Sequence, residues 1–186
     1  MKPIWKYIAV AAVLFISGCG GSGGSDPIAD AWKSFEAKQY SQSFSQFQLI
    51  GLGNPEVNVG LGWNCIRLDT IDLANIYFQA IASDSLEDAY AGWSTALWIQ
   101  GDYQACIDKA NVTLQKSPLY SFQHDPNVTY QDLIWNQASG YFHLADYSNC
   151  INRIKLLDAN FNANPNDANI DAILFNELEA LSNQLQ

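Results

Sequence analysis

Small and large apolar residues recur along the chain around four similar segments that begin at residues 38, 69, 101 and 145. Two columns at fixed distances from these starts hold small residues: Ala31, Gly62, Ser94 and Ala138 before them, and Ser43, Ala74, Cys106 and Cys150 after them. A third column holds Phe47, Phe78, Ala110 and Ile154. Because small residues let two helices approach and larger ones fill the space beside them, the pattern predicts four pairs of helices joined by tight turns.

The predicted helices follow from this alignment. The first helices of the pairs are expected at residues 28–37, 56–68, 86–99 and 130–143, and the second helices at 41–50, 71–83, 103–116 and 147–160. A ninth helix is expected at 168–185, where one apolar stripe contains Ile170, Ile173, Leu174, Leu178, Leu181 and Leu185. Since the last pair would otherwise expose an apolar face, this helix is expected to cap the array.

The repeated unit resembles the tetratricopeptide repeat (TPR). That repeat has a small residue in each helix, Gly-Asp-Tyr at the turn and a closing proline; here Gly101–Tyr103 matches the turn, and Pro55 and Pro118 take the closing position. Lys38 stands where glycine is usual and Ile71 where tyrosine is usual. The resemblance implies an all-α fold, a short right-handed superhelix of about four TPR-like helix pairs over residues 28–165, with a C-terminal capping helix over 166–186.

The N-terminus has the pattern of an export signal. Lys2 and Lys6 precede an apolar run, Tyr7–Ile16, that is too short to span a bilayer as a helix. Ile16–Cys19 has an aliphatic residue, two small residues and a cysteine, and resembles the lipobox of bacterial lipoproteins. The resemblance implies a signal peptide over residues 1–18 and acylation of Cys19 with chains such as palmitate. The alternative is an ordinary secretory signal with a chance cysteine.

Residues 19–27 then form the lipidated cysteine and a flexible Gly/Ser tether. Gly20 stands where an inner-membrane retention signal would have aspartate, so the sorting rule of such lipoproteins favours the outer membrane. We therefore expect a lipid-anchored protein in the bacterial outer membrane, facing the periplasm or exposed on the cell surface.

The net charge and the cysteine spacing argue against two classes of ligand, nucleic acid and metal. The net charge is −10, which argues against nucleic acid because that partner requires a basic surface. Cys65, Cys106 and Cys150 have no metal-binding spacing. We expect all three to be small buried hydrophobic residues, with a disulfide as the alternative in an oxidising compartment.

In a TPR fold the first helices line a concave groove. The aligned columns place these candidate partner-binding residues there: Trp32, Phe35, Val59, Trp63, Ile66, Arg67, Trp98, Trp135, Phe142 and His143. Such aromatic rows can receive a peptide or helix, and they can also stack on sugar rings. The alternative is that they fill the space between the helices of each repeat. Arg67 is the only Lys or Arg in these columns, so a clamp for a peptide carboxylate, which needs several, is not expected.

The last interval between repeats is longer because of an insertion, Leu119–Val128, which contains Tyr120, Phe122 and His124. Insertions in repeat arrays often lie on the binding face. The alternative is a longer turn whose aromatic residues pack against their neighbours.

No motif indicates catalysis, a metal site or a cofactor. His124 with Asp125 lacks further ligands at a recognisable spacing. We therefore expect a membrane-anchored, non-catalytic TPR-like scaffold that binds a protein or peptide partner in the cell envelope and the bilayer through Cys19. The alternative is a glycan- or small-ligand-binding lipoprotein that uses the groove tryptophans.

Overall fold

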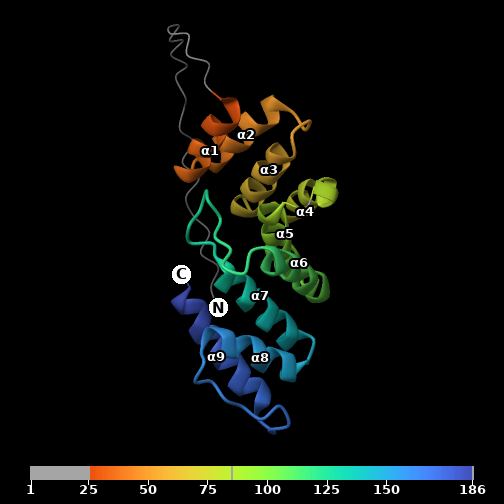
Figure 1. The fold of residues 1–186 in the computed structure, drawn as a ribbon, viewed down its shortest axis with the longest axis vertical. Coiled ribbons are helices and arrows are strands. Elements are labelled where there is room, and N and C mark those ends of the chain that lie inside the picture. Colours follow the sequence, from red (N-terminus) through yellow and green to blue (C-terminus); the bar gives the residue numbers. More distant parts are fainter. Residues whose placement is uncertain (1–25, 85, 186) are drawn as a thin grey trace, which may run out of the picture.

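The structure, a computed structural model, describes residues 26–84 and 86–185. Its helices pair in chain order and stack along the long axis of the molecule (Figure 1). The first helices of the pairs are α1 (Pro27–Glu36), α3 (Pro55–Arg67), α5 (Glu87–Gln100) and α7 (Tyr130–His143). The second helices are α2 (Tyr40–Ile50), α4 (Ile71–Ala80), α6 (Tyr103–Lys116) and α8 (Tyr147–Leu157). A 3-10 turn, η1 (Ala82–Asp84), follows α4, and α9 (Ile170–Gln184) comes last. The predicted helix pairs and the C-terminal helix are confirmed.

The small-residue columns are the lines along which the two helices of a pair touch. All eight of these residues are buried. Ser43 Oγ donates to the Ala31 carbonyl at 2.9 Å, and Ser94 Oγ donates to the Cys106 carbonyl at 3.0 Å, so two pairs are joined directly across this contact. A side chain at Gly62 would place its Cβ 2.5 Å from the ring of Phe78. These columns therefore have small residues because helix backbones or rings occupy the adjacent space.

The same backbone conformation joins the two helices in every pair. Lys38, Asp69, Gly101 and Ala145 have positive φ angles of 60°, 57°, 81° and 55°. The backbone N–H of the next residue reaches back to a carbonyl near the end of the first helix, for example from Asp102 to Leu97 at 3.0 Å. This left-handed residue ends a helix in the usual way, which explains the glycine at position 101.

Helix ends agree with the sequence in most places. Thr129 and Asp132 form a reciprocal capping box at the start of α7. Pro118 follows the end of α6 as expected. Pro55 corrects the expectation that it closes the preceding helix, because α2 already ends at Ile50 and Pro55 is the first residue of α3. A proline fits there because the first helical residue needs no intrahelical N–H bond.

The last helix covers the end of the array. Ile170, Leu174, Leu178 and Leu181 of α9 are buried in one cluster that includes Cys150, Ile151 and Ile154 of α8. The predicted capping role of this helix is therefore confirmed. Among the residues that the structure describes, none of the helices combines the length and apolar composition needed to cross a membrane.

Three of the four cysteines lie among the residues that the structure describes. Cys65, Cys106 and Cys150 are free and buried, in agreement with the hydrophobic interpretation over the disulfide. Cys19, the predicted signal peptide and the tether as far as residue 25 lie outside the described residues.

Candidate binding groove

The inserted loop between α6 and α7 folds back over the first helices. In Figure 1 it extends from the end of α6 towards α1. Backbone hydrogen bonds from Tyr130 N to Tyr120 O (2.7 Å) and from Phe122 N to Val128 O (2.9 Å) close it into a hairpin. The loop is therefore a compact structure of its own, and it meets residues that are distant in the sequence.

Phe122 is the centre of this contact. Its side chain is fully buried. The ring lies nearly parallel to the Trp63 indole, with centroids 4.4 Å apart and planes 17° apart. It also meets the rings of Trp32 and Phe35 edge-on, at 5.9 and 6.0 Å. One aromatic residue from the loop thus fills the space between α1 and α3.

Two polar contacts hold the tip of the loop. The His124 ring stacks on the Trp32 indole, 3.8 Å between centroids and 3° between planes, and its Nδ1 lies 2.8 Å from Glu36 Oε1. Arg67 Nη2 lies 2.6 Å from Asp125 Oδ2. Because Asp125 neutralises it, Arg67 is not a free positive charge for a ligand.

The base of the loop is joined to α5 by a hydrogen bond. Tyr120 is buried, and its hydroxyl donates to Asp88 Oδ1 at 2.8 Å. Burial raises the pKa of the Asp88 carboxyl and of the Tyr120 hydroxyl, and the Asp88 charge raises the Tyr120 pKa further. The hydroxyl therefore stays protonated as a donor.

The loop corrects part of the predicted groove. Trp32, Phe35, Val59 and Trp63 were expected to face an open groove, but each is at most 4 % exposed. The physical reason is that Phe122 and His124 cover the concave side of α1 and α3. The alternative interpretations are the correct ones here: these aromatic residues fill space, and the insertion packs against its neighbours.

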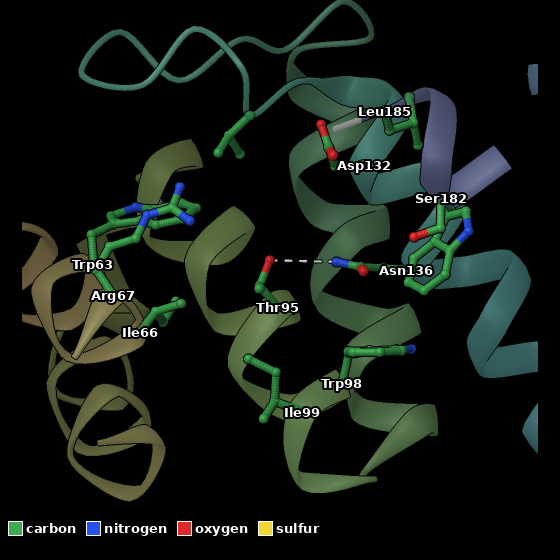
Figure 2. A pocket seen from close by; sticks show the side chains of 12 residues that line it. Trp63, Ile66, Arg67, Thr95, Trp98, Ile99, Asp132, Asn136, Ser182 and Leu185 are labelled. Carbon is green, nitrogen blue, oxygen red and sulfur yellow. Dashed lines mark hydrogen bonds between the residues drawn. The ribbon is translucent and has the colours of Figure 1, made fainter. Parts of the chain in front are cut away.

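An open cavity remains further along the groove. It has a volume of about 250 Å³ and lies between α3, α5, α7 and the end of α9. Figure 2 shows the side chains that converge on it from these helices. The predicted residues that line it are Trp63, Ile66, Arg67, Trp98 and Trp135. The cavity thus brings together half of the predicted groove residues, although Trp63 is only 1 % exposed.

Two tryptophans form the main apolar wall. The rings of Trp98 and Trp135 are 5.1 Å apart with planes inclined by 60°. Trp98 Nε1 donates to Ser139 Oγ at 3.0 Å, and Trp135 Nε1 donates to the Leu178 carbonyl at 2.9 Å. Because both indole N–H groups are satisfied within the protein, these residues offer a ligand ring faces and apolar edges.

The last two predicted residues lie elsewhere. Phe142 packs in the apolar cluster beneath α9. His143, at the end of α7, is exposed and stacks on Tyr103, with centroids 4.2 Å apart. Neither lines the cavity. These two residues are therefore not brought to the cavity, because His143 lies against Tyr103 of α6 and Phe142 lies against Tyr147 of α8.

The cavity also includes residues that the prediction missed. These are Thr95, Ile99, Val128, Asp132, Asn136, Ser182 and Leu185. Ile99 shares the aligned column of Arg67, which is a signal for its position. Ser182 and Leu185 gave no such signal, because the docking of α9 against the groove depends on tertiary packing.

Polar groups border the apolar wall. Asn136 Nδ2 donates to Thr95 Oγ1 at 3.4 Å, which is the dashed line in Figure 2. Asp132 Oδ2 accepts from the backbone and hydroxyl of Thr129, so this oxygen is part of the cap of α7. Within residues 26–84 and 86–185, no group of three or more His, Cys, Asp or Glu residues is placed to hold a metal ion.

The cavity wall therefore offers a ligand the ring faces of the two indoles and a few hydrogen bonds.

Comparisons with known proteins give similarity in structure. No protein-family model matches the chain, and no curated protein sequence matches it. Among solved structures, MamA of MSR-1 superposes with a TM-score of 0.62 and 11 % identity, over 86 % of this chain and 97 % of that one. TTC0263, a thermophilic TPR protein of Thermus thermophilus, gives 0.55 and 14 %, over 86 % and 88 %. A TPR protein from Parabacteroides merdae gives 0.56 and 14 %, over 86 % and 64 %.

Because the sequence identities are low, these superpositions show similarity in fold and nothing about function. The chain has an all-α, TPR-like superhelix, as its repeat pattern predicted.

Proposed function

We propose that this chain is a membrane-anchored, non-catalytic scaffold that holds a protein or peptide partner of the cell envelope in its concave cavity. The observation that carries the proposal is an open apolar cavity, walled by Trp98 and Trp135, on the groove side of a TPR-like fold. Exposed aromatic residues in a concave surface are common anchors for protein partners. The lipobox resemblance at Ile16–Cys19 supports the anchor, and Gly20 supports the outer membrane.

Photocrosslinking in the native host tests the scaffold. A photoreactive residue at position 99 places the probe at the cavity, because Ile99 lines it and is 45 % exposed. The matched control is position 76 on α4, where Ile76 is 59 % exposed and lies away from the cavity. A recurrent protein adduct at 99 but not at 76 is the expected result. Equal adducts at both positions, or none at 99 in a folded protein, would contradict the proposal.

Fractionation tests the anchor separately. The Cys19→Ser chain should leave the membrane fraction, whereas Cys65→Ser should remain there, since Cys65 is buried within α3. Because an uncleaved signal peptide can itself hold the Cys19→Ser precursor in the membrane, the mass of the retained chain is measured as well. Retention of a Cys19→Ser chain that has lost residues 1–18 would exclude acylation as the anchor.

A glycan ligand is the second candidate. Thr95, Asn136 and Ser182 lie beside the two indoles, and sugars combine stacking on aromatic faces with hydrogen bonds to such groups. Quenching of tryptophan fluorescence by oligosaccharides, with no protein adduct at position 99, would favour this candidate over the scaffold.

A further inference from the structure

The inserted loop shows how a segment can bind in this groove. Phe122 places its ring flat on Trp63 and edge-on to Trp32 and Phe35. The ring enters from the hairpin between α6 and α7 and not from the helix pairs of α1 and α3 that it packs against, so in geometry it resembles a bound ligand more than a residue of those pairs. The packing of Phe122 therefore shows that the concave side of the array can bind an aromatic ring.

The open cavity lies one repeat further along the same concave side, and it also has aromatic walls, although the counterparts of Trp63 in the next two repeats are Thr95 and Ser139. Where Phe122 meets Trp63 of α3, the cavity exposes Trp98 of α5 and Trp135 of α7. Among the residues that the structure describes, each of these two indoles has the other as its one ring neighbour. Both are partly exposed, and Val128, at the end of the same loop, lies on the cavity wall. The cavity is thus continuous with the surface that the loop already covers.

Size and charge restrict the occupant. The volume of about 250 Å³ is below the roughly 300–1,000 Å³ of sites that enclose a whole small-molecule ligand. It suits a single side chain. Arg67 is paired with Asp125, so it is not a free positive charge that would select an acidic group. The Asp132 carboxylate accepts only from the neutral backbone and hydroxyl of Thr129, so it keeps its negative charge and disfavours an anionic occupant. An aromatic ring agrees with the volume and with the apolar wall formed by the two indoles.

We propose that the cavity receives an aromatic side chain (Phe, Tyr or Trp) from an extended segment of the partner, which stacks on one of the two indoles, Trp98 or Trp135, as Phe122 stacks on Trp63, and meets the other at an angle. This inference rests on the scaffold function proposed above and adds the chemistry of the partner. The loop limits the partner segment to the part of the groove between α3, α5, α7 and the end of α9.

Synthetic peptides test the ring directly. The probe is a set of Gly/Ser nonapeptides with one central residue (Phe, Tyr, cyclohexylalanine, Leu or Ala), titrated into the full chain in detergent and followed by indole N–H resonances in NMR. Cyclohexylalanine is the matched control because it keeps the size and apolar character of Phe but lacks the π face. We expect Phe to bind about fivefold more tightly than cyclohexylalanine, as aromatic pairing beyond area burial implies. Equal affinities would overturn the proposal.

Variants locate the binding. Ile99→Glu places a charge at the mouth of the cavity and should weaken the Phe peptide at least tenfold. Ile76→Glu, the same change at a similarly exposed isoleucine of α4, should leave the affinity unchanged within twofold. Equal loss in both variants would show that the peptide binds elsewhere, which overturns the proposal.

The same titrations separate this inference from the scaffold function. Binding of all the peptides at the cavity without preference for a ring overturns the aromatic inference and leaves the scaffold intact. Failure of all the peptides, together with perturbation of the same indoles by chitotetraose, overturns both and favours the glycan candidate.

Discussion

At the scale of single residues, the four turns between paired helices hold different residue types in the same left-handed backbone conformation. Gly101 adopts φ 81° without a penalty, whereas Lys38, Asp69 and Ala145 adopt 55° to 60° with a Cβ atom. A non-glycine residue in the left-handed region costs about 1–2 kcal/mol. The turn geometry is therefore imposed at three positions by the packing of the helices on either side.

Ala145→Gly should raise stability. Glycine removes the left-handed penalty of about 1–2 kcal/mol but adds about 0.5–1 kcal/mol of unfolded-chain entropy, so the net gain should be about 0.5 kcal/mol. Urea unfolding followed by circular dichroism measures it. The reciprocal control is Gly101→Ala, which should lower the free energy of unfolding by about 0.5 kcal/mol. A gain from Gly101→Ala would contradict the assigned turn conformation.

The buried thiols should make the free energy of unfolding depend on pH in the alkaline range. Burial raises the pKa of Cys106 from 9.0 to about 11 and that of Cys150 from 9.0 to about 12. Above pH 9 the unfolded chain releases these protons while the folded chain keeps them. The contribution of the thiols is therefore complete below pH 9 and is lost as pH rises towards 11 and 12.

The test compares the protein with its Cys106→Ala/Cys150→Ala variant under reducing conditions. Between pH 9 and 10.5 the unmodified protein should lose up to about 1.4 kcal/mol per pH unit more for each thiol than the variant loses. Other titrating groups, including Tyr120, contribute to both proteins alike. If the free energy of unfolding falls equally in the two proteins over this interval, the thiols are not the cause of the pH dependence.

At the scale of elements, α9 stabilises the end of the array through its apolar face. Leu174 is fully buried, whereas its neighbour Phe175 is 55 % exposed. Leu174→Ala should lower the free energy of unfolding by about 2–5 kcal/mol, because it leaves a cavity between α7, α8 and α9. Phe175→Ala, on the opposite face, should change it by less than about 0.5 kcal/mol. Chemical denaturation of the two variants measures the difference, and similar losses would mean that α9 does not dock as described.

The same element shows what a sequence pattern can and cannot predict. The stripe Ile170–Leu185 gave the helix and most of its buried face because its spacing is local to one helix, although Ile173 is 36 % exposed. The pattern did not place Ser182 and Leu185 at the cavity, since this depends on the direction in which α9 crosses α7. Likewise the aligned columns gave every helix pair, but they assigned Trp32 and Trp63 to an open groove because nothing local encodes the position of a loop that lies many residues away.

At the scale of the whole molecule, the inserted loop changes a linear array into a more coupled structure. In a simple repeat array each unit contacts its neighbours, so the ends open independently. Here His124 contacts Trp32 and Glu36 of α1, while Tyr120 contacts Asp88 of α5. The loop therefore joins the first pair directly to the third, and both should open together.

Phe122→Ala tests this coupling. Loss of the fully buried ring should lower the free energy of unfolding by about 3–5 kcal/mol and let α1 and α2 open locally. Hydrogen exchange should then show a larger loss of protection in α1 than in α8, which is remote from the loop. The matched control is Leu119→Ala in the same loop, where the side chain is 79 % exposed and little change is expected. If protection falls equally in α1 and α8, the molecule unfolds as one unit without the loop, and the loop is not what couples its two halves.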